Sequence, residues 1–247
     1  MDRALYVAMT GATQTMRAQT ANNNNIANAG TTGYRAELTA LMPVSVQGPG
    51  LPTRVNAQAA TGGWDSTAGS IIQTGNPLGV AMRQDNWLAV QAPDGTEAYT
   101  RAGDLRLNSL GQLSNGAGHL VLGDSGPISV PQNSSITVGG DGTLSIVPLG
   151  QGPETQASVG RLRIVEAKPE QLERGADGLM RARAGQKLDA ATGEVLMSGG
   201  LESSNVNLAG AMVNMIELAR QFELQVKMMK SVEDNASAAS TLVRMNN

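Results

Sequence analysis

The stretch NLAGAMVNMIELARQFELQVKMMKSVEDNASAASTLV, residues 207–243, decides the fold. Apolar side chains recur in it at steps of three and four, which is the spacing of one stripe along an α-helix. The stripe comprises Leu208, Met212, Met215, Ala219, Phe222, Val226, Met229, Val232, Ala236, Ala239 and Val243. At the helical rise per residue such a helix is roughly 50 Å long. That length is unusual in a globular core, so the stripe needs a partner.

The predicted partner lies at the other end of the chain, in residues 2–25. The side chains that recur there at threes and fours are Leu5, Met9, Ala12, Met16, Gln19, Asn23 and Ile26. Asp2 suits the start of a helix because its carboxylate can accept hydrogen bonds from the first free amides. The polar members Gln19 and Asn23 can fix register and partner choice at a cost in stability. The alternative is that both stripes are core faces of one globular domain.

Four consecutive asparagines, residues 22–25, come at the end of this first helix. Asparagine side chains compete for backbone hydrogen bonds and disfavour the helical conformation. Gly30 and Gly33 then permit a turn. Two interpretations stay open: a frayed helix end with a loop, or a polar surface that pairs with neighbouring subunits through its amide groups.

The composition of the segment 37–70 differs from that of the first predicted helix. Its residues that break regular structure are Pro43, Gly48, Pro49, Gly50 and Pro52. Glycine and proline at this density favour neither helix nor strand, and the polar, glycine-rich residues 61–65 prolong the pattern. We therefore predict an extended connector over residues 37–70.

From about residue 71 the apolar period becomes two, in short runs separated by turns. The strongest hairpin signal joins residues 136–138 to residues 144–146, because Ile136 and Val138 would share a face with the apolar side chains of the second run. Short strands at such regular spacing are typical of an all-β domain.

The sequence thus predicts an α+β fold in which the terminal helices flank an independent β domain. Residues 1–36 and 201–247 are expected to form a discontinuous helical stem, paired like a coiled coil. Residues 37–70 form the connector, and residues 71–200 form a β-rich outer domain.

The composition excludes several classes of function. The chain has 247 residues, a formal net charge of -3 and 2% aromatic residues, whereas nucleic-acid binding usually requires a basic surface and stacking aromatics. We therefore predict no nucleic-acid partner. The absence of cysteine excludes thiol nucleophiles, disulfides and cysteine-ligated metals. No apolar run approaches the about 20 residues of a membrane span, and no cleavable secretory signal is expected at the N-terminus.

No motif points to catalysis or metal binding. His119 is the only histidine and lies beside a β run, where a structural role is far commoner than that of a catalytic base. Residues 139–142 lack the spaced acidic ligands of a calcium loop, so a hairpin turn explains them better. The aspartates considered as a glycosidase carboxylate pair are Asp94, Asp104, Asp124 and Asp141. Each adjoins a glycine or a turn, where aspartate is favoured for backbone reasons. We expect no enzyme activity, no cofactor, no metal and no small-molecule substrate.

Segments at both ends resemble the signatures of the bacterial flagellar rod and hook proteins. NNIAN at residues 24–28 and TTGYR at residues 31–35 are similar to that family's Asn-Asn-Leu-Ala-Asn and Thr-x-Gly-Phe/Tyr-Lys/Arg. SNVN at residues 204–207 and the run 212–223 resemble its second signature. Residues 87–90 together with residues 99–104 resemble the family's β domain less sharply.

The resemblance implies a structural subunit of the flagellar basal-body rod, the drive shaft that crosses the periplasm, transmits torque and surrounds the export channel. It implies that the partners are other rod proteins, copies of the same chain and the flagellar type III export apparatus. Residues 220–230 are most similar to a proximal-rod member of the family. A distal-rod or hook subunit is the alternative within the family, and a secreted β-domain adhesin or hydrolase is the alternative outside it.

The assembly interface is expected on the two helices and their flanking signatures. We predict that these helices order when neighbours pack them, and that head-to-tail contacts build a helical tube. The methionine-rich stretches either adapt to unlike neighbours or fill gaps in a core. The expected interface residues are Leu5, Met9, Ala12, Met16, Asn24, Asn25, Ile26, Asn28, Thr32, Gly33, Tyr34, Asn205, Asn207, Met212, Met215, Ile216, Arg220, Phe222, Val226 and Met229.

Overall fold

A computed structural model describes residues 2–45, 55–152 and 155–245. The chain forms two compact units. The first, which we call the helical unit, consists of Met1–Ala29, Ala36–Asp65 and Val206–Asn247. The second, which we call the β unit, consists of Gly30–Arg35 and Ser66–Asn205. The predicted α+β class, with a helix at each end and a β-rich middle, is confirmed.

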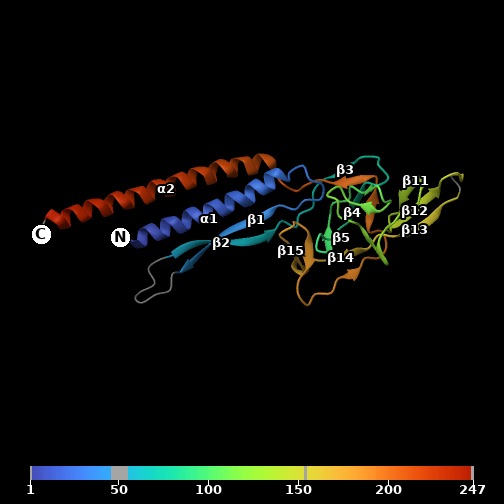
Figure 1. The fold of residues 1–247 in the computed structure, drawn as a ribbon, viewed down its shortest axis with the longest axis horizontal. Coiled ribbons are helices and arrows are strands. Elements are labelled where there is room, and N and C mark those ends of the chain that lie inside the picture. The colour runs from blue at the N-terminus through green and yellow to red at the C-terminus, as the bar shows by residue number, and fades with distance from the viewer. Residues whose placement is uncertain (1, 46–54, 153–154, 246–247) are drawn as a thin grey trace. The chain divides into compact units, whose positions relative to one another are not determined.

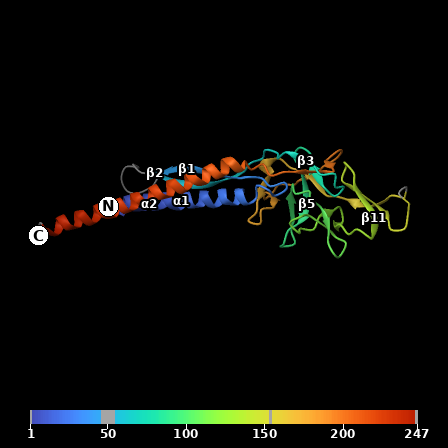
Figure 2. The ribbon, with the colours of Figure 1, turned by 90° about the horizontal axis from the view of Figure 1, so that it is seen from above.

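The helical unit contains both helices and two strands. Their bounds are α1 (Asp2–Ala27), β1 (Glu37–Ser45), β2 (Val55–Trp64) and α2 (Leu208–Met245). The two helices lie side by side in this unit (Figures 1 and 2). They run antiparallel, because Asn22 of α1 contacts Ala211 of α2 while the earlier residue Thr15 contacts the later residue Gln225.

The buried face of α1 carries small and polar side chains. Its members are Ala8, Ala12, Gln14, Thr15 and Ala18. The Thr15 hydroxyl donates to Gln225 Oε1 at 3.2 Å, and Asn22 Nδ2 donates to the Ala211 carbonyl at 2.8 Å. A methyl group added at Gly11 would lie 3.1 Å from Gln225 Nε2. The helices therefore meet through a close, partly polar contact, and such contacts favour one register over others.

Helix α1 continues through all four asparagines to Ala27, where their low helix propensity predicted fraying. Tertiary hydrogen bonds account for the difference. The Asn25 side chain donates to the Glu37 carbonyl at 2.9 Å and accepts from the Glu37 amide at 2.8 Å. Asn28 Nδ2 donates to the Asn24 carbonyl at 2.9 Å and so satisfies the end of the helix.

The prediction of an extended connector over residues 37–70 is wrong for most of its length. β1 and β2 pair antiparallel, from Glu37 opposite Trp64 to Ser45 opposite Val55. Pro43 is tolerated because both strands of a two-stranded ribbon are edge strands, on which a missing amide donor need not break the ladder. Pro49 and Pro52 lie outside the described residues.

The β unit contains the remaining strands. They are β3 (Ile71–Gln73), β4 (Val80–Met82), β5 (Asn86–Gln91), β6 (Glu97–Thr100), β7 (Arg106–Leu107), β8 (Leu113–Ser114), β9 (Leu122–Gly123), β10 (Gly126–Pro127), β11 (Asn133–Val138), β12 (Thr143–Pro148), β13 (Ala157–Arg161), β14 (Ile164–Glu166), β15 (Leu172–Arg174), β16 (Met180–Ala182), β17 (Asp189–Ala190), β18 (Leu196–Ser198) and β19 (Gly200–Glu202). A 3-10 turn covers Pro169–Gln171.

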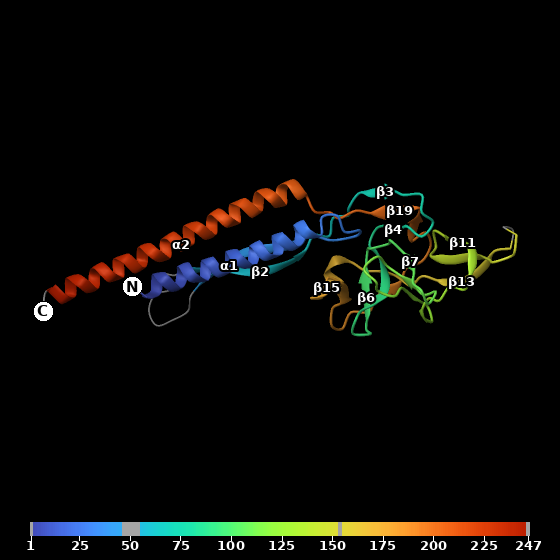
Figure 3. The same cartoon turned by 45° about the horizontal axis from the view of Figure 1, so that its top comes forward.

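The largest sheet of the β unit has six strands in the order β15-β16-β6-β5-β14-β17, and its pairs are antiparallel. A three-stranded sheet, β11-β12-β13, contains the predicted hairpin. Ile136 pairs with Ile146 and Val138 with Leu144, so the predicted shared face is confirmed. Figure 3 shows β19, the last strand of the unit, beside β3, the first.

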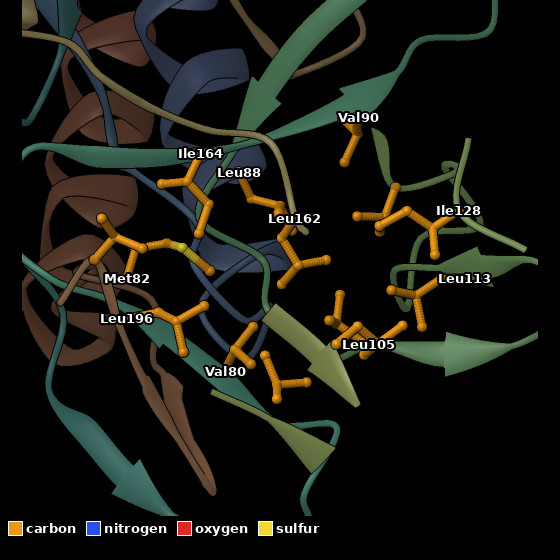
Figure 4. Packing of buried hydrophobic residues seen from close by; sticks show 14 of the residues in the cluster. Val80, Met82, Leu88, Val90, Leu105, Leu113, Ile128, Leu162, Ile164 and Leu196 are labelled. Atoms are coloured by element: carbon orange, nitrogen blue, oxygen red, sulfur yellow. The ribbon is translucent and has the colours of Figure 1, made fainter. Parts of the chain in front are cut away.

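One hydrophobic core holds the β unit together. Figure 4 shows side chains from many short strands pointing toward one another, including Leu88 of β5, Leu113 of β8 and Leu196 of β18. Leu88, Leu113 and Leu144 are fully buried. Burial of this kind lets strands of two or three residues stay folded, because their stability comes from the shared core.

Among the described residues, neither helix combines the length and the apolar character that crossing a membrane requires.

Candidate functional site

Most of helix α2 is left uncovered by the helical unit. It has 38 residues, yet among its residues of described burial only Ala211 is buried. Ile216, at 66% exposure, projects a large apolar side chain into solvent. The exposed large apolar residues of α2 are Leu208, Met212, Val213, Met215, Ile216, Leu224, Val226 and Met228. We call this set the α2 apolar surface.

Helix α1 carries a second exposed stripe. Leu5, Met9 and Met16 share one helix face and are exposed, and Tyr6 is exposed beside them. These side chains are therefore left uncovered in the helical unit, although their spacing is that of a helix–helix seam. The face that does pack is offset from this stripe around the helix and contains the small residues described above. Both helices thus present apolar surface on the sides that their mutual contact leaves open.

Several predicted interface residues are engaged inside their own unit. Ala12 is buried on the packed face of α1, and Asn25 binds the backbone of Glu37. In the β unit, Asn205 Nδ2 donates to the Thr67 carbonyl at 2.9 Å. The Tyr34 ring lies under the guanidinium of Arg174, 4.7 Å from ring centroid to Cζ. These contacts stabilise single units and do not by themselves point to a neighbour.

Gly33 has a backbone role of the same kind. Its φ of 66° is left-handed, and a Cβ there would lie 2.2 Å from the Arg101 carbonyl carbon. The Gly33 amide donates to the Glu202 carbonyl at 2.8 Å. Only glycine fits this close approach in this conformation.

The other predicted interface residues divide by exposure. Those exposed are Leu5, Met9, Met16, Asn24, Asn207, Met212, Met215, Ile216, Arg220 and Val226. Those half-buried are Ile26, Asn28, Thr32, Phe222 and Met229. Phe222 and Met229 are seven residues apart, with Gln225 between them, on the side of α2 that meets α1.

Sequence reasoning missed part of the exposed surface. Val213 and Leu224 lie off the single stripe predicted along α2, and Tyr6 lies off the stripe of α1. Met228 also lies off the α2 stripe, but it belongs to the methionine-rich stretches that were predicted either to adapt to neighbours or to fill a core. The available signal was that apolar residues occur on more than one face of α2, which is typical of a helix covered from several sides.

Three of the residues considered for catalysis, Asp94, Asp141 and His119, have structural roles in the β unit. The Thr96 hydroxyl and amide bind the Asp94 carboxylate and hold its pKa below the usual value. Thr143 does the same for Asp141, whose pKa is also lowered. A lowered pKa makes a carboxyl group a poor general acid at neutral pH. The backbone of His119 closes a turn with Asn115. In the described part of the chain, no cluster of three or more potential ligands could hold a metal ion.

Comparison with known proteins identifies the same family from two directions. Residues 197–242 match the model of the flagellar basal body rod FlgEFG protein C-terminal region. Residues 81–146 match that of the flagellar hook protein FlgE/F/G D1 domain. The first match begins at β18 and runs through most of α2, and the second lies within the β unit.

Relatives that match this chain along nearly its whole length belong to the same family. The flagellar basal-body rod protein FlgF of Escherichia coli strain K12 is 46% identical over 99% of this chain and 100% of its own length. FlgF of Salmonella typhimurium strain LT2 is 45% identical, again over 99% of this chain and 100% of its own. The rod protein FlgG of Agrobacterium fabrum is 31% identical over 96% of this chain and 98% of its own. The predicted family is therefore confirmed: the chain belongs to the flagellar basal-body rod proteins and is similar to FlgF along its whole length.

Proposed function

We propose that this structural subunit of the flagellar basal-body rod polymerises through its helical unit, with the exposed apolar surfaces of α1 and α2 covered by neighbouring subunits. The neighbours are other rod proteins and further copies of the chain. In this proposal α1 and α2 pair like a coiled coil and form a stem that surrounds the export channel. The assembled rod transmits torque across the periplasm, and the chain occupies its proximal part.

The observation that carries the proposal is the coverage of α2. Among the residues of α2 whose burial is described, one is buried, so its own chain leaves most of this 38-residue helix uncovered. Helices are stabilised in proteins mainly by packing of their apolar faces, and contiguous exposed apolar surface marks an interaction site. Subunit packing supplies the missing partner for side chains such as Ile216 and Val213.

The contact between α1 and α2 supports pairing of the two helices within one subunit. Thr15, Gln225 and Asn22 fix the register of the pair, as described above. A fixed register places the apolar residues of both helices at set positions. Head-to-tail contacts between such surfaces, repeated without closing into a ring, build a helical tube.

The proposal also includes export by the flagellar apparatus and the absence of enzyme activity. Homologues of the chain are rod proteins, and two aspartates considered for catalysis, Asp94 and Asp141, bind the backbone and side chains of turns in the β unit. Neither observation calls for a substrate or a cofactor.

The test compares two single variants, each of which introduces one negative charge at a different position of the same helical turn. Ile216→Glu places a carboxylate on the α2 apolar surface, and Asn214→Glu places one at an exposed polar position. In a strain that lacks the native chain, Ile216→Glu is expected to abolish swimming and rod completion, because a buried unpaired charge opposes subunit packing. Asn214→Glu is expected to retain both.

Circular dichroism of the purified variants separates assembly from folding. Both variants are expected to keep the helical signal and melting temperature of the parent chain, because both positions are exposed in the subunit. Normal swimming and normal rods with Ile216→Glu would contradict the proposal.

A further inference from the structure

Glu202 is an unusual residue for its surroundings. It is a carboxylate at 1% exposure in the β unit, and it lies between two buried arginines. Arg35 Nη2 is 2.6 Å from Glu202 Oε1, and Arg101 Nε is 2.7 Å from Oε2. Buried charges persist only when they are paired and hydrogen-bonded, and removing one partner is strongly destabilising.

The cluster joins segments that are far apart in the sequence. Arg35 ends Gly30–Arg35, the short stretch through which the chain first enters the β unit before residues 36–65 return to the helical unit. Glu202 ends β19, near the end of the second stretch, Ser66–Asn205, through which the chain leaves the β unit. Glu202 Oε1 also accepts from the Gly69 amide at 3.0 Å. Backbone hydrogen bonds join the same two segments, because the Gly33 amide donates to the Glu202 carbonyl and the Asn205 amide donates to the Tyr34 carbonyl.

The two arginines are held differently. Arg101 donates to the backbone carbonyls of Met82, Gln84 and Asn86, and its guanidinium lies 5.5 Å from the centroid of the Trp87 ring. These groups belong to β4, β5 and the turn between them, so Arg101 is fixed to the core. Arg35 belongs to the entering segment and reaches the same carboxylate from the other side.

We propose that Arg35, Glu202 and Arg101 form an ionic clasp in which Arg101 is the fixed anchor, Glu202 the link and Arg35 the latch. The clasp holds the entering and leaving segments of the β unit against each other and against the core. Opening the latch releases residues 30–35 while the core strands stay folded. The clasp is independent of the proposed assembly through the helices.

Hydrogen exchange of the full chain, measured by mass spectrometry, tests the latch. Arg35→Gln is expected to raise exchange in residues 30–35 and 66–70 by about tenfold or more, as loss of a hydrogen bond between charged groups implies. Exchange in β5 should stay unchanged. Glu202→Gln should release the same segments and also lower the melting temperature, because both arginines then lose their counter-charge.

A surface pair supplies the matched control. Arg83 Nη1 and Glu194 Oε2 are 3.1 Å apart in the same unit, with side chains 50% and 75% exposed. Glu194→Gln is expected to change neither exchange nor melting, because exposed pairs contribute little. The double variant Arg35→Gln/Glu202→Gln should show no faster exchange in these segments than Glu202→Gln alone, because both changes break the same ion pair.

Three results would overturn the clasp. Exchange in residues 30–35 that is unaffected by Arg35→Gln would show that the ion pair does not hold the segment. Equal acceleration in β5 would show a general structural role without a latch. Full additivity of the two changes would show that Arg35 and Glu202 act separately.

Discussion

Asn25 gives a sharp test of how the helical unit is held together, because one side chain of α1 binds both backbone groups of Glu37. Asn25→Ala removes two hydrogen bonds, each worth about 0.5–1.5 kcal/mol net, or about 1–3 kcal/mol together. Alanine regains up to about 0.7 kcal/mol through its higher helix propensity. The helical unit should therefore lose about 0.3–3 kcal/mol of unfolding free energy, and about 1–2 kcal/mol in the middle of this range.

Urea unfolding followed by far-ultraviolet circular dichroism measures this loss, because both helices belong to the helical unit. The unfolding midpoint is expected to fall by roughly 0.5–1 M at an ordinary denaturant slope. Asn23→Ala is the matched control, since Asn23 is exposed and lies two residues away. It should be neutral or stabilising by up to about 0.7 kcal/mol. Equal midpoints for the two variants would refute the role of Asn25.

Three further predictions concern the β unit. Leu88→Ala should lower the unfolding free energy of the β unit by about 2–5 kcal/mol, because Leu88 is fully buried in β5 and its truncation leaves a cavity. Denaturant unfolding measures this loss, and a loss within error of zero would contradict the core packing. Gly33→Ala should lower the unfolding free energy of the β unit by at least about 1–2 kcal/mol, because of its left-handed backbone alone, and the overlap of the new Cβ with the Arg101 backbone adds to this loss. Gly30→Ala should be tolerated, because the space around Gly30 is open. Burial and the Glu97 carboxylate raise the pKa of Tyr99 from 10.0 to about 12, so its contribution to stability is complete below pH 10 and is lost as the pH rises through about 12. An alkaline absorbance titration of the parent chain and Tyr99→Phe checks this, and a phenol that titrates at its ordinary pKa would contradict it.

The long helix could be predicted because its apolar spacing persists over many turns, and such a signal does not depend on tertiary context. The buried face of α1 could be predicted only in part. The predicted stripe contained Leu5, Met9 and Met16, which are exposed, and its small member Ala12 is buried together with Ala8 and Thr15, which the stripe did not contain. Small side chains give a weak sequence signal, yet they are the ones that let two helices approach closely.

The strands β1 and β2 were missed for a related reason. Proline and glycine are counted against strands, but the penalty for proline vanishes on an edge, and whether a strand is an edge is a property of the folded sheet. The hairpin of β11 and β12 could be predicted because its period and turn are local. The cluster of Arg35, Arg101 and Glu202 gives no local signal, because folding alone brings these residues together.

The central claim is that neighbouring subunits cover the apolar surface of α2 in the rod. The chain has no cysteine, so a single thiol can be placed at will. The variant Ile216→Cys is reacted with a maleimide, once as the free chain and once in purified basal bodies. Leu110→Cys, at an exposed position of the β unit, serves as the reference for labelling in the free chain. The account predicts that the thiol at position 216 reacts readily in the free chain and is protected in the assembled rod. Equal reactivity in both states would contradict it.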